Sequence, residues 1–220
     1  MSSGGLASRD YYLGRMKSIR AVGVAAVLGA GFGAATSLIN DLSSAYGKLG
    51  NRLVGTTWTW VSDVAEVGSL LLDVGWAWAA VAVAAGWLGG AGAIRWGAMA
   101  GTVSLMAATA AYFVMDSLLR EEAVTGYLGE ARYWWLASLT LGPLLGAVGA
   151  SLARFGVTGL LAGLIVPVGA LVQTLFLRPE LASSSHPEEV WALGIVSAAA
   201  IACVSLVVAR FALQRRRVPA

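Results

Sequence analysis

The chain has 220 residues, of which 58% are hydrophobic and only 12% are charged, with a mean hydropathy of +0.73. Soluble domains carry about twice this share of charge, so the composition excludes an ordinary soluble domain and indicates an integral membrane protein. The single Cys203 excludes an intrachain disulfide, and together with the single His186 it forms no Cys–His metal cluster. We therefore expect neither a metal nor a cofactor.

Six apolar runs follow one another along the chain, each long enough to cross a hydrocarbon core of about 30 Å. The predicted spans are residues 19–39, 68–90, 94–118, 133–152, 157–177 and 190–213. They form one transmembrane domain over 19–213, between a basic segment at 1–18 and a basic tail at 214–220. The first run is longer than the core of a secretory signal, which has about 7–15 residues. The predicted fold is all-α, a polytopic bundle of six transmembrane helices.

The distribution of charge predicts the orientation of this bundle. Six spans place both termini on one side, which also holds ten of the fifteen basic residues: Arg9, Arg15, Lys17, Arg20, Arg95, Arg154, Arg210, Arg215, Arg216 and Arg217. Every acid except Asp10 falls on the other side. Because Lys and Arg are enriched on the cytoplasmic side, both termini are predicted to be cytoplasmic. We expect a multi-pass protein of the bacterial cytoplasmic membrane, in contact with lipid and not with nucleic acid.

The connection at residues 40–67 is a long first outer loop, longer than a turn between two spans requires. We expect it to form a lid, a surface helix or a re-entrant segment, and its sequence does not decide among these.

The first span carries a small residue at every fourth position, namely Ala21, Ala25, Gly29 and Gly33. This spacing gives a helix one smooth face, against which another helix can pack closely. The ordinary explanation is packing inside the bundle. The alternative is a docking face for a partner subunit in the membrane.

Residues 57–90 gather acidic and indole side chains where an apolar helix meets water. Treated as one continuous helix, the segment places Asp63, Glu66 and Asp73 within an arc of roughly 80°. Asp73 lies inside the apolar run, where a carboxylate is costly unless it is paired or faces a polar cavity. Asp116 has a similar position at the end of the third span. The candidate ligand-binding residues are Asp63, Glu66, Asp73, Asp116, Tyr112, Trp58, Trp60, Trp76 and Trp78.

Structural explanations exist for the same residues. Tryptophans near the ends of spans form the aromatic belt that many membrane proteins have. Asp73 could be held by an ion pair with Arg52, Arg120 or Arg132, and Asp116 could be an ordinary interfacial residue at a helix end.

Carboxylates beside indole faces suit a cationic ligand, because a cation is attracted by the ring quadrupole and neutralised by the carboxylate. The leading hypothesis is a small-solute binding or transport component with an outward-facing acidic and aromatic pocket for a cationic or aromatic ligand. A second is a membrane-embedded enzyme acting on an isoprenoid or lipid substrate, with Asp73, Glu66 or Asp116 as the proton donor. A third is a non-catalytic accessory subunit of a larger membrane complex. Whether the protein is an enzyme stays open.

Two resemblances accompany these hypotheses. The segments GWAWAAVAVAAGWLGG, GAMAGTVSLMAATAAYFVMDSL, WWLASLTLGPLLGAVGASLAR and GLLAGLIVPVGAL resemble a family of small actinobacterial six-span membrane proteins of unknown function. The ground plan is similar to that of the S components of energy-coupling-factor vitamin transporters, in which a small-residue first helix meets the coupling subunit. Ala21-x-x-x-Ala25 matches that pattern. The resemblance implies that 40–67 is a lid over a ligand pocket.

Overall fold

The computed structural model describes residues 4–90, 93–177 and 186–216, and the side chains of residues 19–89, 93–176 and 186–215. Its helices are α1 (Gly4–Ser43), η1 (Gly50–Arg52), α2 (Thr59–Leu72), α3 (Gly75–Gly90), α4 (Ile94–Arg120), η2 (Val124–Tyr127), α5 (Leu128–Ser151), α6 (Val157–Val172), η3 (Gln173–Leu177) and α7 (Pro187–Arg216). No strand occurs in these ranges. The prediction of an all-α fold is confirmed.

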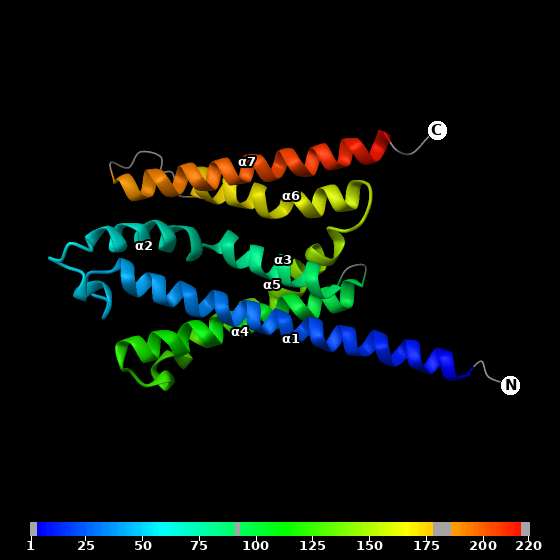
Figure 1. The fold of residues 1–220 in the computed structure, drawn as a ribbon, viewed down its shortest axis with the longest axis horizontal. Coiled ribbons are helices and arrows are strands. Elements are labelled where there is room, and N and C mark those ends of the chain that lie inside the picture. The colour runs from blue at the N-terminus through cyan, green and yellow to red at the C-terminus, as the bar shows by residue number, and fades with distance from the viewer. Residues whose placement is uncertain (1–3, 91–92, 178–185, 217–220) are drawn as a thin grey trace.

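Five of these helical segments are long and apolar enough to cross a membrane: Ile19–Ser43, Ile94–Arg120, Val124–Ser151, Val157–Phe176 and Pro187–Arg215. A sixth crossing is formed if α2 and α3 count together as one bent span. The described part of the chain is therefore a helical bundle with five or six candidate spans, as expected of a multi-pass membrane protein. Figure 1 shows the start of α1 and the end of α7 at the same end of the bundle.

The stretch 57–90 is not the continuous helix that we expected. Helix α2 ends at Leu72, α3 begins at Gly75, and the two axes are bent by 66°. Asp and Gly are both poor residues for a helix interior, and Asp73 and Gly75 flank the bend. The predicted arc therefore applies only to the acids of α2, since Asp73 follows the last residue of that helix. The same break divides the predicted span 68–90.

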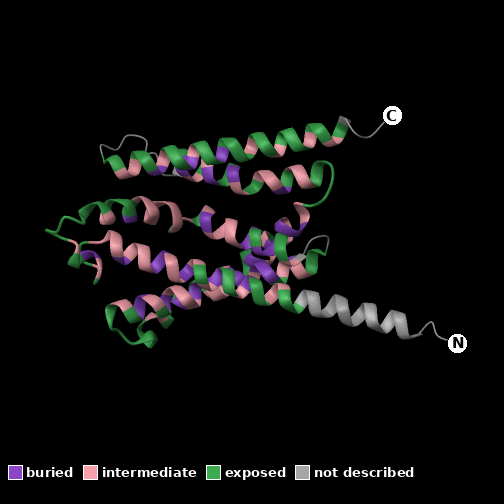
Figure 2. Cartoon of the chain, viewed as in Figure 1, coloured by how far each residue is buried: buried purple, intermediate pink, exposed green. Residues whose placement is uncertain are grey.

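Helices α1, α3, α4 and α5 form the best-buried part of the bundle, whereas α6 and α7 are largely exposed along its side (Figure 2). Its core is built from small residues. The largest fully buried side chains are Thr36, Ser37 and Ser104. Close approach of backbones therefore replaces the interlocking of large side chains, as in many membrane bundles.

The small-residue face of the first span packs inside the chain. An ideal Cβ on Gly29 would lie 1.9 Å from the carbonyl oxygen of Ser104, and one on Gly33 would lie 1.9 Å from that of Ala108. Ala25 is 1% exposed on the same face of α1. Helix α4 therefore packs on the face that, in the alternative hypothesis, would contact a partner subunit. Ala21, nearer the start of the span, is half-buried.

A second close crossing joins α5 to α3 and α4. A Cβ on Gly146 would lie 2.1 Å from the carbonyl oxygen of Gly97, and one on Gly86 would lie 2.2 Å from that of Gly146. Gly149 approaches the carbonyl oxygen of Val83 to 2.0 Å by the same measure. These contacts fix α5 against its neighbours at the end of the bundle that holds the termini.

Candidate functional site

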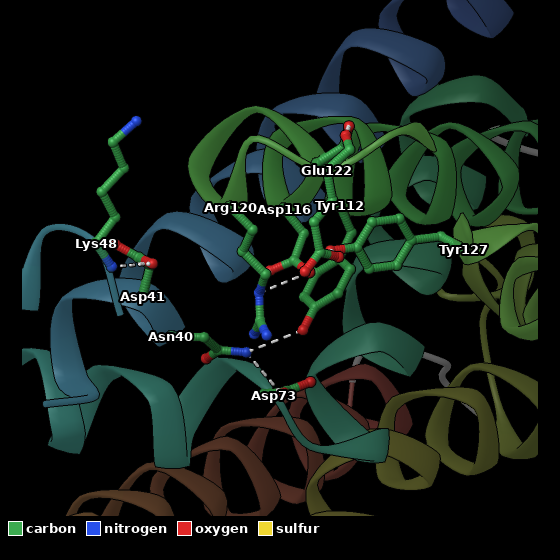
Figure 3. Close-up of polar contacts among 10 residues, drawn as sticks. Asn40, Asp41, Lys48, Asp73, Tyr112, Asp116, Arg120, Glu122 and Tyr127 are labelled. Carbon is green, nitrogen blue, oxygen red and sulfur yellow. Dashed lines mark hydrogen bonds and ion pairs between the residues drawn. The ribbon is translucent and has the colours of Figure 1, made fainter. Parts of the chain in front are cut away.

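Asn40 organises the polar contacts around the break between α2 and α3 (Figure 3). Its Nδ2 donates hydrogen bonds to Oδ2 of Asp73 at 2.8 Å and to the hydroxyl of Tyr112 at 3.3 Å. Its Oδ1 accepts a hydrogen bond from Oγ of Ser69 at 2.8 Å. One side chain of α1 thus joins the end of α2, the break and α4. The sequence analysis missed Asn40, although it is a polar amide at the end of the first apolar run.

The other side of the break is held by Gln173 of η3. Its Oε1 accepts a hydrogen bond from the backbone N–H of Trp76 at 3.1 Å, in the first turn of α3. Free backbone groups are costly in an apolar bilayer, so a broken span requires partners of this kind. Side chains from α1 and η3 therefore stabilise the break from two sides.

Beside the break lies a cavity of about 310 Å³ between α3, α4 and α5. Its polar or charged lining residues are Asp73, Glu130, Tyr112, Thr109 and Ser138, and its other lining residues are Val74, Gly75, Trp78, Ala79, Leu105, Phe113, Trp134, Ala137, Leu141 and Leu145. The lining contains two carboxylates and no Lys or Arg. This volume is near the lower end of the range for small-molecule sites, which is about 300–1,000 Å³.

Trp78 is the centre of the aromatic wall of this cavity. Its ring lies 6.4 Å from that of Trp134 with an interplanar angle of 23° and 6.2 Å from that of Tyr112 in an edge-on arrangement. Phe32 of α1 packs against its far side, edge-on at 5.3 Å. The indoles of α3 and α5 are thus fixed next to the carboxylates. A cation bound there would meet both a negative charge and aromatic faces.

Of the nine predicted ligand-binding residues, three line this cavity: Asp73, Trp78 and Tyr112. Trp76 faces the other way, into a hollow of about 20 Å³ that it shares with Gln173 and α7. Asp116 is buried and forms an ion pair with Arg120, whose Nε lies 3.1 Å from its Oδ2.

The remaining four lie on or beside α2, outside the cavity lining. Asp63 and Glu66 are exposed on that helix. Trp58 and Trp60 are also exposed, and their rings lie 6.0 Å apart. The structure therefore does not gather the acids of residues 57–90 into one cluster.

Glu130 and Trp134 line the cavity but are not among the predicted ligand-binding residues. A helical signal could have found them. Residues 130, 134, 138, 141 and 145 are spaced by three or four, so they share one face of α5. That face is acidic and aromatic at its start and aliphatic further along the helix.

A structured loop after α1 contacts the C-terminal end of α4. Asp41 is buried, and its Oδ1 and Oδ2 accept hydrogen bonds from the backbone N–H groups of Lys48 (2.9 Å) and Leu49 (2.8 Å). The ammonium group of Lys48 pairs with Glu121, just beyond the end of α4. This hydrogen bond and the positive charge lower the pKa of the Glu121 carboxyl below its ordinary value. The loop is therefore held to α1 through Asp41 and to the end of α4 through Glu121.

Among the residues that the structure describes, no ion pair to Asp73 lies within 4 Å, and no group of three or more His, Cys, Asp or Glu could hold a metal ion. Asp73 accepts the hydrogen bond from Asn40 and keeps its exposed side toward the cavity.

Comparisons of the chain with protein-family models, with curated proteins and with solved structures found no match.

Proposed function

We propose that the protein binds a small organic cation in this cavity, as a solute-binding or transport component of the bacterial cytoplasmic membrane. The observation that carries the proposal is the composition of the cavity wall. Asp73 and Glu130 bring negative charge, Trp78 and Trp134 bring indole faces, and no basic side chain in the lining competes for the carboxylates. A cation over an aromatic face gains about 0.5–2 kcal/mol, in addition to its attraction to the carboxylates.

We further infer six crossings, with both termini in the cytoplasm. The bent pair α2–α3 counts as one crossing in this arrangement. The termini then share a side with Arg95, at the start of α4, and with Arg154, between α5 and α6. The loop after α1 and the start of α5 lie at the opposite end (Figure 1). The cavity residues Asp73 and Glu130 adjoin the start of α3 and the start of α5, so we take their end of the cavity as its mouth, and the site would open to the outside. The enrichment of Lys and Arg on the cytoplasmic side supports this orientation.

Transport is favoured over simple binding by the broken helix. In several transporter folds, the substrate site is built where a discontinuous helix exposes its ends near other helices. Here Asp73, Val74 and Gly75, the residues of the break, all line the cavity. The loop that Asp41 and Lys48 hold would serve as the outer cover, in agreement with the ground plan of vitamin-transporter S components.

The enzyme alternative has less support from the geometry. Of its three candidate acids, only Asp73 lines the cavity, while Asp116 is neutralised by Arg120 and Glu66 projects from α2 elsewhere. The accessory-subunit alternative was motivated by the small-residue face of the first span, which α4 covers at Gly29 and Gly33. We therefore favour cation binding over both.

Titration with phenyltrimethylammonium tests the proposal, with binding followed by native mass spectrometry of the protein in micelles of a non-ionic detergent. Asp73→Asn is expected to weaken binding by about tenfold, which corresponds to about 1.4 kcal/mol. Asp63→Asn is the matched control, because Asp63 is an exposed acid of α2 outside the cavity, and it should bind like the parent protein. Equal losses in both variants, or no binding to the parent, would reject the site.

A further inference from the structure

We propose that the natural ligand is an amphiphile, an ammonium group on an apolar chain, which enters the cavity sideways from the bilayer past Leu141. This inference rests on the proposed function and names its ligand class. The ammonium group would lie between Asp73 and Glu130, and the chain would follow the α5 wall toward Leu145.

The cavity lining extends over several turns of α5. It runs there from Glu130 to Leu145, a distance of about 22 Å at 1.5 Å per residue. A volume of about 310 Å³ spread over this length is narrow, and it suits a chain better than a compact ring system. A small water-soluble cation would occupy only the part next to the carboxylates.

The polarity of the lining changes along that length. The mouth holds Asp73, Glu130 and the hydroxyl of Tyr112, and the far end is lined by Leu105, Leu141 and Leu145. Between them lie Thr109 and Ser138, and the Ser138 hydroxyl already donates to the carbonyl oxygen of Trp134. Water in such an apolar hollow lacks hydrogen-bond partners, so it does not stabilise the far end. An apolar chain would fill it without leaving a polar group unpaired.

Two residues of the cavity wall on α5 are also exposed on the outside of the bundle. Leu141 and Trp134 line the cavity, yet they are 52% and 53% exposed. Leu141 lies about 20 Å along α5 from its first residue Leu128, well inside the candidate span Val124–Ser151. A surface at that depth of a membrane contacts hydrocarbon rather than water. The cavity is therefore open to lipid along α5 as well as to solvent at its mouth.

The charge of the lining selects among amphiphiles. Two carboxylates without a basic partner repel an anionic head group and do not pair with a neutral one. A zwitterionic phospholipid would place its phosphate close to these carboxylates. The class that fits is a monocationic amphiphile.

A pair of probes with the same head group tests the inference. Phenyltrimethylammonium has no chain, and dodecyltrimethylammonium carries a long one; lysophosphatidylethanolamine is the zwitterionic comparison. Leu141→Trp places an indole in the side opening, while Leu144→Trp is the matched control, because Leu144 is 65% exposed on the same helix and does not line the cavity. Binding is again measured by native mass spectrometry in non-ionic micelles, and the fold of each variant by circular dichroism.

We expect Leu141→Trp to weaken dodecyltrimethylammonium binding at least tenfold and to weaken phenyltrimethylammonium binding much less, because the short probe stays beside the carboxylates. Leu144→Trp should change neither, and lysophosphatidylethanolamine should not bind the parent protein. If Leu141→Trp does not fold, Leu145→Phe provides a second obstruction of the far end, with the same expected result.

Two outcomes separate this inference from the proposed function. If phenyltrimethylammonium binds in an Asp73-dependent manner but the long-chain probe does not, or binds equally well to Leu141→Trp, the amphiphile is rejected and the cation site stands. Binding of lysophosphatidylethanolamine as tight as that of dodecyltrimethylammonium would reject the selection for a monocation. If neither trimethylammonium probe binds the parent protein, both proposals fail.

Discussion

Gly33→Ala is expected to destabilise the bundle, because α1 and α4 touch at this residue through their backbones. An ideal Cβ on Gly33 would lie 1.9 Å from the carbonyl oxygen of Ala108. To restore an ordinary contact, the two helices must move apart by about 1.5 Å. That displacement would be felt along the whole face that includes Gly29, whose backbone contact with Ser104 is equally close.

The magnitude follows from two opposing effects. Overpacking a filled core costs about 1–3 kcal/mol, and a backbone carbonyl cannot rotate away as a side chain can, which favours a value of about 3 kcal/mol. Alanine is a better helix former than glycine by about 1 kcal/mol, which offsets part of this loss. We therefore expect the free energy of unfolding to fall by about 2 kcal/mol. For a chain of this size the corresponding fall in Tm is about 4–8 °C.

Gly31→Ala is the matched control for this measurement. Gly31 lies on the same helix, and an added Cβ there would meet no atom within 4 Å. Thermal unfolding of both variants, followed by far-UV circular dichroism in one detergent, should show Gly31→Ala as stable as the parent or slightly more so. If Gly33→Ala is equally stable, α1 and α4 do not pack through this face, and the partner-docking explanation of the small residues would return.

Three further predictions concern the end of the bundle opposite the termini. Asn40→Leu removes the side chain that joins three neighbours around the break. It should lower the free energy of unfolding, measured by thermal unfolding, by about 2 kcal/mol. It should also weaken phenyltrimethylammonium binding severalfold in native mass spectrometry. The Lys48–Glu121 contact should depend on pH, because folding lowers the pKa of the Glu121 carboxyl. Glu121 therefore stabilises the loop fully above the ordinary glutamate pKa of about 4.3. The stabilisation is lost as the pH falls through the lower pKa of the folded state. A spin label at Tyr46→Cys should then become more mobile in acid, and Glu121→Gln should make it mobile at neutral pH; a label that is equally ordered in both conditions would contradict the pairing. Glu122→Cys should react with an impermeant thiol reagent added outside intact cells, and reaction only after lysis would reverse the inferred topology.

The helices themselves could be predicted from the sequence, because a long apolar run in a chain with few charges has one stable structure in lipid. The segments 94–118 and 157–177 correspond closely to α4 and to α6 with η3. Helix α1 continues to Ser43, beyond the predicted end of its apolar run at residue 39. Its last turn carries Asn40 and Asp41, whose side chains are satisfied by partners that hydropathy does not report.

The break at Asp73 could not be predicted with the same certainty, because its stabilising partners are distant in sequence. Asn40 reaches Asp73 across 33 residues, and Gln173 reaches Trp76 across 97. The residues Asp73 and Gly75 indicate only that a helix is weak at this point.

The different orientations of Trp76 and Trp78 follow from helix geometry. Residues two apart on a helix point about 200° away from each other, so both indoles cannot enter one site. Only Trp78 lines the cavity, whereas Trp76 faces Gln173 and α7. The sequence analysis placed both in one site because it grouped residues by their nearness in the chain. Counting faces on the helix that begins at Gly75 would have separated them.

The small-residue face illustrates a different limit. Repeated Ala and Gly predict that another backbone comes close, but they carry no information about whose backbone it is. In the structure it is the backbone of α4, at Ser104 and Ala108. Long apolar helices of the same chain compete with any partner for such a face, and the connection between them keeps their local concentration high.

The two partners of the break also explain why the cavity lies where it does. Asn40 belongs to the buried group of helices around α4, whereas Gln173 belongs to the exposed pair α6–α7, which contacts the rest of the bundle mainly through α2 and α3. The residues Asp73, Val74 and Gly75 are therefore the place where these two parts of the bundle are joined. A ligand charge next to Asp73 acts on the carboxylate that Asn40 holds, and the N–H bound by Gln173 is only three residues away. If the proposed function is right, ligand binding and the position of α6–α7 would be linked through three residues, which is the coupling that a transport component requires.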